Sequence, residues 1–179
     1  MTRLAVSALA LLMMLAAGAR AENNPVYESW AKHKPGTSIK LKMVSEAAGN
    51  KTEMETVQTL KEVTPEKVVI ENQTTMSVMG QKLEQPAMPM EIPAKMPAGQ
   101  PGAAEPTKSP DVQTKESTET VSVSGKSVSA KVLETKDKTS WSKAWSSNDV
   151  PGTVVKMESK TTGDMASSMT MELVEMSIK

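Results

Sequence analysis

Methionine is the residue type in this chain whose chemistry is most suggestive. The sequence holds 15 methionines, one histidine and no cysteine. Thioether sulfur is a soft ligand that suits Cu(I). Met88, Met90 and Met96 fall in a proline-rich segment where burial is not the obvious reason for them. These three residues form a candidate metal site. Methionines at alternate positions of a strand need no metal, because alternate residues share one face.

Patterns typical of enzymes are incomplete. His33 is the only histidine, so a Ser-His-Asp arrangement would have to use it. It lies in a lysine-rich segment, which favours a structural role. Residues 125–127 match the end of a phosphate-binding P-loop, but the glycine required five residues earlier is Thr120. Glu53 and Glu55 share one face of a predicted strand and are interpreted as solvated carboxylates. We therefore expect no catalysis and no bound cofactor.

Large aromatic side chains are scarce, with three tryptophans, one tyrosine and no phenylalanine. Tyr27 and Trp30 lie three residues apart in a predicted helix, so they share one face. Trp141 and Trp145 lie four apart in a predicted strand and also point the same way. Such residues usually belong to a core, but a pocket lined by methionine and tryptophan would suit an apolar ligand. These four aromatics are the candidate ligand-binding residues.

The N-terminal residues predict export. A basic start precedes an apolar run over residues 4–17, and Ala19-Arg20-Ala21 fits an A-x-A cleavage site. The run is shorter than the roughly 20 residues of a membrane-spanning helix. We therefore expect a signal peptide over residues 1–21, cleavage after Ala21, and a periplasmic or secreted protein without a transmembrane segment. Both arginines of the chain precede this site, and the absence of a basic patch argues against a nucleic-acid partner.

Hydrophobic alternation predicts about eight strands, bounded by turn residues. Asn24 and Pro25 suit the start of a short helix that ends at residues 34–36. The sequence thus predicts a mainly β protein, with a curved antiparallel sheet or open barrel and a short N-terminal helix, as a single domain over residues 22–179. Bulges are expected in the second strand and near Val174. The expected strands are residues 37–47, 53–63, 67–79, 116–123, 128–132, 139–146, 153–160 and a last strand that starts near Met169.

Residues 85–114 differ in kind from the rest, because they hold seven of the 11 prolines. Proline removes a backbone donor, so regular sheet or helix is not favoured there. We expect a proline-rich, partly disordered insertion, most clearly over residues 98–110. The earlier residues 88–93 could instead lie along the sheet as an ordered edge.

Two stretches resemble uncharacterised exported bacterial proteins. The first stretch is residues 30–39, with a W-x-x-x-K-P-G-[ST] start, followed by residues 59–64. The second is residues 145–147 with residues 149–156, which contain a V-P-G-x-V-V-K strand entry. The order of elements is also similar to the periplasmic lipoprotein-carrier type of fold, in which a curved antiparallel sheet wraps over a helix. The resemblance implies a location in the cell envelope and that fold. The arginine-bearing sites of the carrier family have no counterpart here.

These observations favour an exported, non-catalytic envelope protein that binds an apolar small molecule, a lipid or a protein partner. The physical reason is a methionine-rich sheet face, which can re-pack around varied apolar partners. The alternative is a methionine-rich Cu(I)-binding protein that uses Met88, Met90 and Met96. An enzyme is the less favoured reading.

Overall fold

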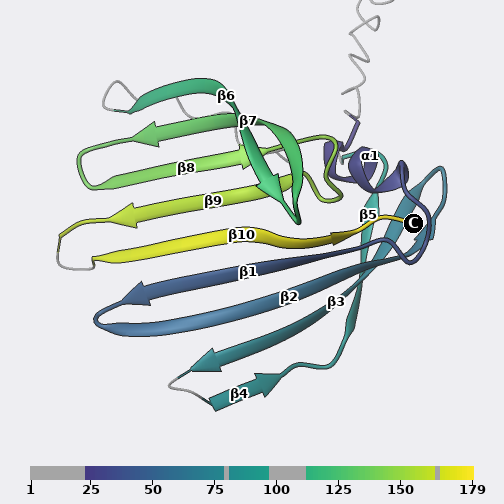
Figure 1. Ribbon diagram of the computed structural model, residues 1–179, viewed down its shortest axis with the longest axis horizontal. Coiled ribbons are helices and arrows are strands. Elements are labelled where there is room, and N and C mark those ends of the chain that lie inside the picture. Colours follow the sequence, from purple (N-terminus) through teal and green to yellow (C-terminus); the bar gives the residue numbers. More distant parts are fainter. Residues whose placement is uncertain (1–22, 79–80, 97–111, 164–165) are drawn as a thin grey trace, which may run out of the picture.

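The computed structural model describes residues 23–78, 81–96, 112–163 and 166–179. They form one short helix and ten antiparallel strands of a single curved sheet (Figure 1), which confirms the predicted fold class. The predicted signal peptide and residues 98–110 lie outside the described residues. The elements are α1 (Pro25–Ala31), β1 (Ser38–Ala47), β2 (Asn50–Val63), β3 (Lys67–Val78), β4 (Gln81–Glu84), β5 (Met88–Pro93), β6 (Gln113–Val123), β7 (Lys126–Lys136), β8 (Ser140–Ser146), β9 (Val154–Thr161) and β10 (Ser167–Ser177).

Two meanders make up the sheet: strands β1 to β5 form the first and strands β6 to β10 the second. The strand order is β4-β3-β2-β1-β10-β9-β8-β7-β6, and β5 also pairs with β3. The two meanders meet where β1, the first strand, pairs along its full length with β10, the last. Within the described part of the chain, β4 and β6 end this order and do not pair with each other, so the sheet is open.

The sheet has ten strands where the sequence predicts about eight. β4 and β5 are the additional strands, and both pair with β3, which β5 covers over Lys67–Asn72 and β4 over Thr75–Val78. All four side chains of β4 are exposed, so no apolar alternation signals that strand. Pro89 and Pro93 fit β5 because an edge strand can leave one side of its backbone unpaired. The proline-rich range thus contributes an ordered edge, as one of its two readings allows.

Both predicted bulges are present. In β10, Leu173 pairs with Leu41 and Glu175 with Lys40, which leaves Val174 as the extra residue. In β2, the register shifts between Leu60 and Glu62. A bulge increases the local twist of a strand, and both lie toward the end of the sheet where α1 packs.

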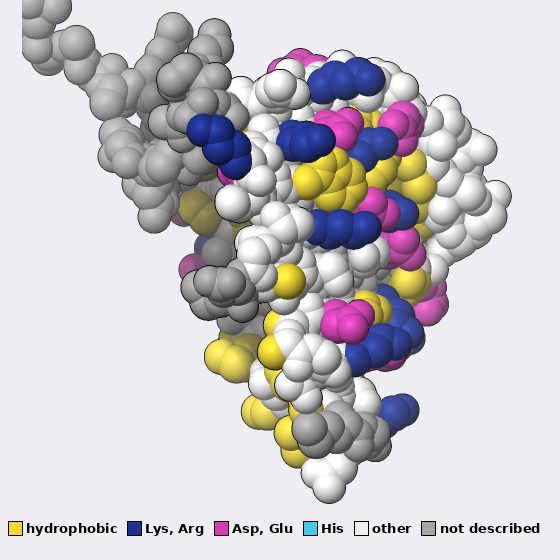
Figure 2. Space-filling view, turned by 90° about the vertical axis from the view of Figure 1, so that its left-hand side faces the viewer, with side chains coloured by type: hydrophobic (Ala, Val, Ile, Leu, Met, Phe, Trp, Pro, Cys, Tyr) yellow, Lys and Arg dark blue, Asp and Glu magenta, His cyan; other side chains and the backbone are white. Residues whose placement is uncertain are grey.

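Cross-strand pairing separates the side chains of the sheet into two faces. Lys42 pairs with Glu172, which pairs with Lys156, and these three side chains point to one side. Ion pairs such as Lys156–Glu172, at 3.1 Å, connect them. Alternation places the neighbouring Met43 and Met171 on the opposite side. We name the two sides the charged face and the methionine face; in Figure 2, basic and acidic side chains alternate down the right-hand side of the molecule.

Helix α1 lies against the methionine face and connects distant parts of the sheet. Its N-cap residue, Asn24, accepts a hydrogen bond from the backbone of Val26 and donates one to the carbonyl of Pro93 in β5. Near the other end, the Ser29 hydroxyl accepts a 2.9 Å hydrogen bond from the backbone of Gly152. Gly152 belongs to the loop between β8 and β9. The helix therefore joins the β5 edge to a loop of the second meander.

The charged face has its own buried region, under the hairpin of β6 and β7. The last part of β6 bends across the front of β8 and β9 toward β10 (Figure 1). Ser124 at the hairpin tip donates to the carbonyl of Val174 in β10. Val123, at the end of the bent strand, is buried together with Ala130 of β7 and Trp145 of β8.

Asp137 organises the turn between β7 and β8. Its carboxylate accepts hydrogen bonds from the backbone of Thr139 and Ser140, both at 2.7 Å, and from the Ser140 hydroxyl at 2.6 Å. These bonds, that of the Ser140 hydroxyl first, lower the pKa of Asp137 from 3.8 to about 2. The turn is thus stabilised by the ionised carboxylate.

The Asp137→Ala variant should melt at a lower temperature than the parent protein at pH 7. Because the folded pKa lies below the unfolded one, the carboxylate stabilises the fold above pH 3.8, and this contribution is lost as the pH falls through about 2. The difference in melting temperature should therefore shrink over that range. Asp137→Asn keeps an acceptor oxygen but no charge, so the difference in melting temperature between the asparagine and alanine variants should not change over that pH range. Equal melting temperatures for the parent and the alanine variant at pH 7 would contradict this account.

Candidate functional site

A continuous row of apolar side chains crosses the methionine face. Each member is the direct cross-strand partner of the next, so neighbouring Cβ atoms lie about 4.5–5.5 Å apart. Five methionines follow one another in the middle of the row, and each is half-buried. The row runs from β4 to β7 through Leu83, Met76, Met54, Met43, Met171, Met157, Ala144 and Leu133.

The composition of this row makes it adaptable. Methionine is unbranched and polarisable, so it fits irregular apolar shapes at little cost. Contiguous apolar surface on a protein commonly marks a binding site. Leu83, at one end of the row, is 60% exposed, which shows that the row reaches the surface at the β4 edge.

Charge is almost absent from the methionine face. Across all described strands, Glu116 of β6 and Lys131 of β7 are the only charged residues whose register places them on this side. Glu116 pairs directly with Leu133, the last apolar residue of the row. Strand charges elsewhere in the described sheet point to the charged face. The two charges therefore mark one end of an otherwise uncharged surface.

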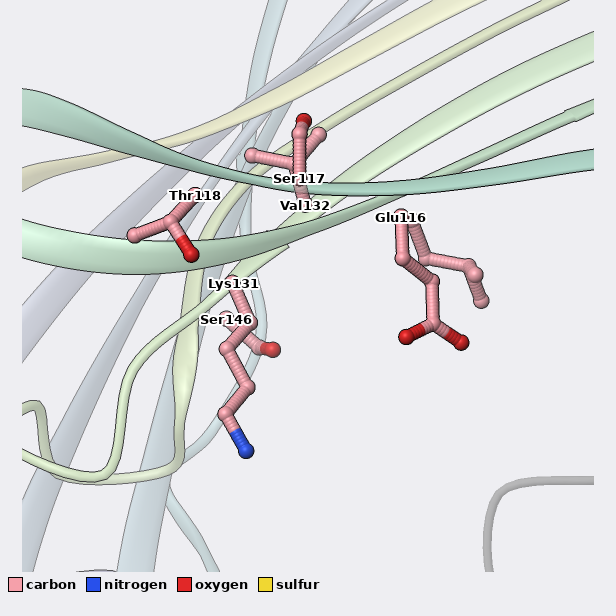
Figure 3. A pocket seen from close by; sticks show the side chains of 7 residues that line it. Glu116, Ser117, Thr118, Lys131, Val132 and Ser146 are labelled. Atoms are coloured by element: carbon pink, nitrogen blue, oxygen red, sulfur yellow. The ribbon is translucent and has the colours of Figure 1, made fainter.

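Glu116 and Lys131 line a cavity of about 470 Å³ over β6, β7 and β8. Thr118, Leu133 and Ser146 also contribute to its wall. Figure 3 shows the two charged side chains leaving their strands in the same general direction, with their charged ends well separated. Neither side chain forms an ion pair within the described residues.

The predicted aromatic residues of α1 pack on the methionine face, near Ile39 and the loop between β8 and β9. Trp30 is fully buried. A Cβ atom on Gly152 would lie 3.4 Å from its indole nitrogen and 3.6 Å from Ile39, which belongs to the methionine face. Tyr27 is half-buried, and its hydroxyl donates a 2.7 Å hydrogen bond to the carbonyl of Thr64. Both residues thus pack the helix onto the sheet.

The two strand tryptophans lie on the charged face instead. Trp145 is buried; its indole N–H donates to Glu119 at 2.7 Å, and Lys143 lies 4.5 Å from its ring centroid. Hydrogen bonds from Lys143 and then Trp145 lower the pKa of Glu119. Trp141 is half-buried and donates to Glu134 at 2.8 Å. The structure therefore does not bring the four aromatics together, and their ligand-binding role stays a prediction.

The candidate metal residues are only partly grouped. Met88 and Met90 lie on β5 and point to the methionine face. Their side chains are 62% and 41% exposed. Met96 follows the strand and is half-buried. The sulfur of Met90 accepts a 3.8 Å hydrogen bond from the side-chain amide of Asn72. Two of the three methionines are therefore strand residues rather than loop residues, and the Cu(I) hypothesis stays a prediction.

The residues considered for catalysis in the sequence, His33, Glu53 and residues 125–127, lie apart from one another in the fold. His33 is half-buried, and burial, followed by the charge of Lys32, lowers its pKa. Glu53 pairs with Lys42 at 3.2 Å on the charged face. Within the described residues, no three His, Cys, Asp or Glu side chains gather where they could hold a metal ion. Residues 125–127 belong to the hairpin between β6 and β7 rather than to a strand–loop–helix unit.

The methionine row and its charged end are absent from the predicted site residues. Their signal in the sequence is the alternation of methionine with charge inside each strand, as in Lys42-Met43 and Met171-Glu172. That signal shows which residues share a face within a strand. It does not show which strands are neighbours, so the row emerges only from the register.

Comparisons with known proteins add little. No protein-family model and no curated protein gives a significant match to the sequence. One solved structure that is similar is a DUF1329 family protein from Desulfovibrio piger ATCC 29098, with 13% sequence identity and a TM-score of 0.30, over 82% of this chain and 87% of that one. No helix among the described residues is long and apolar enough to cross a membrane.

Proposed function

We propose that this protein binds an apolar ligand on its methionine face, in a non-catalytic role in the cell envelope. The observation that supports this proposal is the row of five adjacent methionines on an almost uncharged side of the sheet. The export signal predicted over residues 1–21 supports the envelope location.

The energetics of the row favour this role. Burial of apolar surface contributes about 25 cal/mol per Å², so covering several half-exposed methionines with a ligand is favourable. Without a ligand, the row stays in contact with water and this free energy is not gained. Ion pairs occupy the charged face, so an apolar ligand would have to disrupt them there. The methionine face is therefore the side of the sheet on which an apolar ligand binds.

A lysine in the middle of the row tests this proposal. The Met171→Lys variant should bind N-phenyl-1-naphthylamine, an uncharged fluorescent apolar probe, at least about tenfold more weakly than the parent protein. The reason is that a bound apolar ligand would bury the new ammonium group without a partner. Binding is measured from the rise in probe fluorescence on titration.

The matched control is Thr170→Lys, which adds the same charge one residue away on the charged face. Thr170 pairs with Glu158, so the new lysine finds an opposite charge nearby. Its probe affinity should equal that of the parent protein. Equal affinities of the Met171 variant and the parent, or equal losses in both variants, would show that the probe does not bind on the methionine face.

A further inference from the structure

We infer that the ligand is a zwitterionic amphiphile whose acyl chain follows the methionine row and whose head group lies between Lys131 and Glu116. This inference rests on the proposed function and names its ligand class. In the described sheet, these two side chains are the only charges on the methionine face, and both line the same cavity.

The cavity and the row are continuous. Leu133 belongs to both, because it ends the row and lines the cavity. From Leu133 to Met54 the row crosses five strand spacings, about 24 Å. One leaflet of a membrane has a hydrocarbon thickness of about 15 Å, half of the roughly 30 Å core. The row is therefore long enough for one extended acyl chain.

The two charges fit a head group that carries both signs. Lys131 offers an ammonium group to a phosphate, and Glu116 offers a carboxylate to an amine. Neither has an ion-pair partner within the described chain, so neither is already neutralised. A purely anionic head group would pair with Lys131 but leave Glu116, which lines the same cavity, without an opposite charge. A phosphate joined to an amine satisfies both side chains at once.

The cavity is of a suitable size for such a head group. Its volume of about 470 Å³ falls in the range of about 300–1,000 Å³ that small-molecule sites occupy. Thr118 and Ser146 add hydroxyl groups to its wall. These can donate hydrogen bonds to phosphate oxygens.

The experiment compares two amphiphiles with the same acyl chain. Palmitoyl lysophosphatidylethanolamine carries a phosphate joined to a primary ammonium group, and palmitate carries only a carboxylate. Both are titrated below their micelle-forming concentrations, and binding is measured by calorimetry. The parent protein should bind the lysophospholipid more tightly. Lys131→Glu should weaken lysophospholipid binding about ten- to a hundredfold, as expected for the loss of a hydrogen-bonded charge contact.

Two further variants serve as controls. Lys115→Glu makes the same charge change on β6 but on the charged face, and should leave the affinity unchanged. The double variant Lys131→Glu with Glu116→Lys restores one charge of each sign in the cavity, and should regain most of the lost affinity. Circular dichroism checks that each variant folds.

Two outcomes would overturn the head-group assignment. One is equal affinity of the parent for the two amphiphiles; the other is equal lysophospholipid affinity of the Lys131 and Lys115 variants. In either case, binding of the uncharged probe and its loss in Met171→Lys would leave the proposed function standing. Failure of the uncharged probe to bind the parent protein would instead count against the proposed function itself.

Discussion

Replacing Trp30 with alanine should lower the free energy of unfolding by about 3–5 kcal/mol, the cost typical of removing a large buried aromatic side chain. Trp30 is fully buried and packs α1 against the methionine face and the loop between β8 and β9. Ser29, the residue before it in the helix, accepts a hydrogen bond from the backbone of Gly152 in that loop. Urea denaturation followed by far-ultraviolet circular dichroism measures the change.

Trp141→Ala is the matched control for this variant. It removes the same kind of side chain from the charged face, where Trp141 is only half-buried. Its loss of stability should be clearly smaller. Equal losses in the free energy of unfolding for the two variants would show that the burial of the Trp30 side chain under α1 contributes no special stability.

Replacing Gly152 with valine should cost about 2–5 kcal/mol of stability, from about 1–2 for a side chain in the left-handed region and about 1–3 for overpacking. Gly152 has a backbone φ of +78°, a value that residues other than glycine rarely adopt. A Cβ atom there would also lie 3.4 Å from the indole nitrogen of Trp30. The substitution therefore strains the loop and pushes against the helix.

Gly49→Val separates these two contributions. Gly49 has a φ of +76°, close to that of Gly152, but no atom lies within 4 Å of the position of its Cβ. It should therefore show only the backbone cost, about 1–2 kcal/mol. Urea denaturation of both variants gives the comparison. Equal losses would mean that Gly152 is needed for its backbone conformation alone, and not for its approach to Trp30.

These two predictions concern one part of the molecule, where α1 connects the two meanders. The helix is anchored to β5 by Asn24 and to the β8–β9 loop by Ser29. It packs one end of the methionine face, while Glu116 and Lys131 lie at the β6–β7 side. The row of methionines, which runs from β4 to β7, is the adaptable part of that face. In this arrangement, rigid packing at the helix supports a surface that can adjust to a ligand.

Local patterns were sufficient for most of the secondary structure. Asn24 and Pro25 predict the start of α1, because an N-cap side chain and proline suit the first turn of any helix. The phase slip after Leu173 predicts the bulge at Val174, because strand alternation has a period of two. β4 escaped prediction because its four residues are all exposed and carry no apolar alternation.

Alternation along each strand shows which of its side chains share a face, since it depends only on neighbouring residues. Which strands are neighbours follows from the folded sheet alone, above all for the pairing of β1 with β10, which are separated by most of the chain. That pairing joins Met43 to Met171 and makes one row out of two groups of methionines. The packing of α1 and the register of β8 also place Trp30 and Trp145 on opposite faces, although both are buried aromatics. Such long-range register depends on the packing of the whole sheet and the helix, which no local pattern contains.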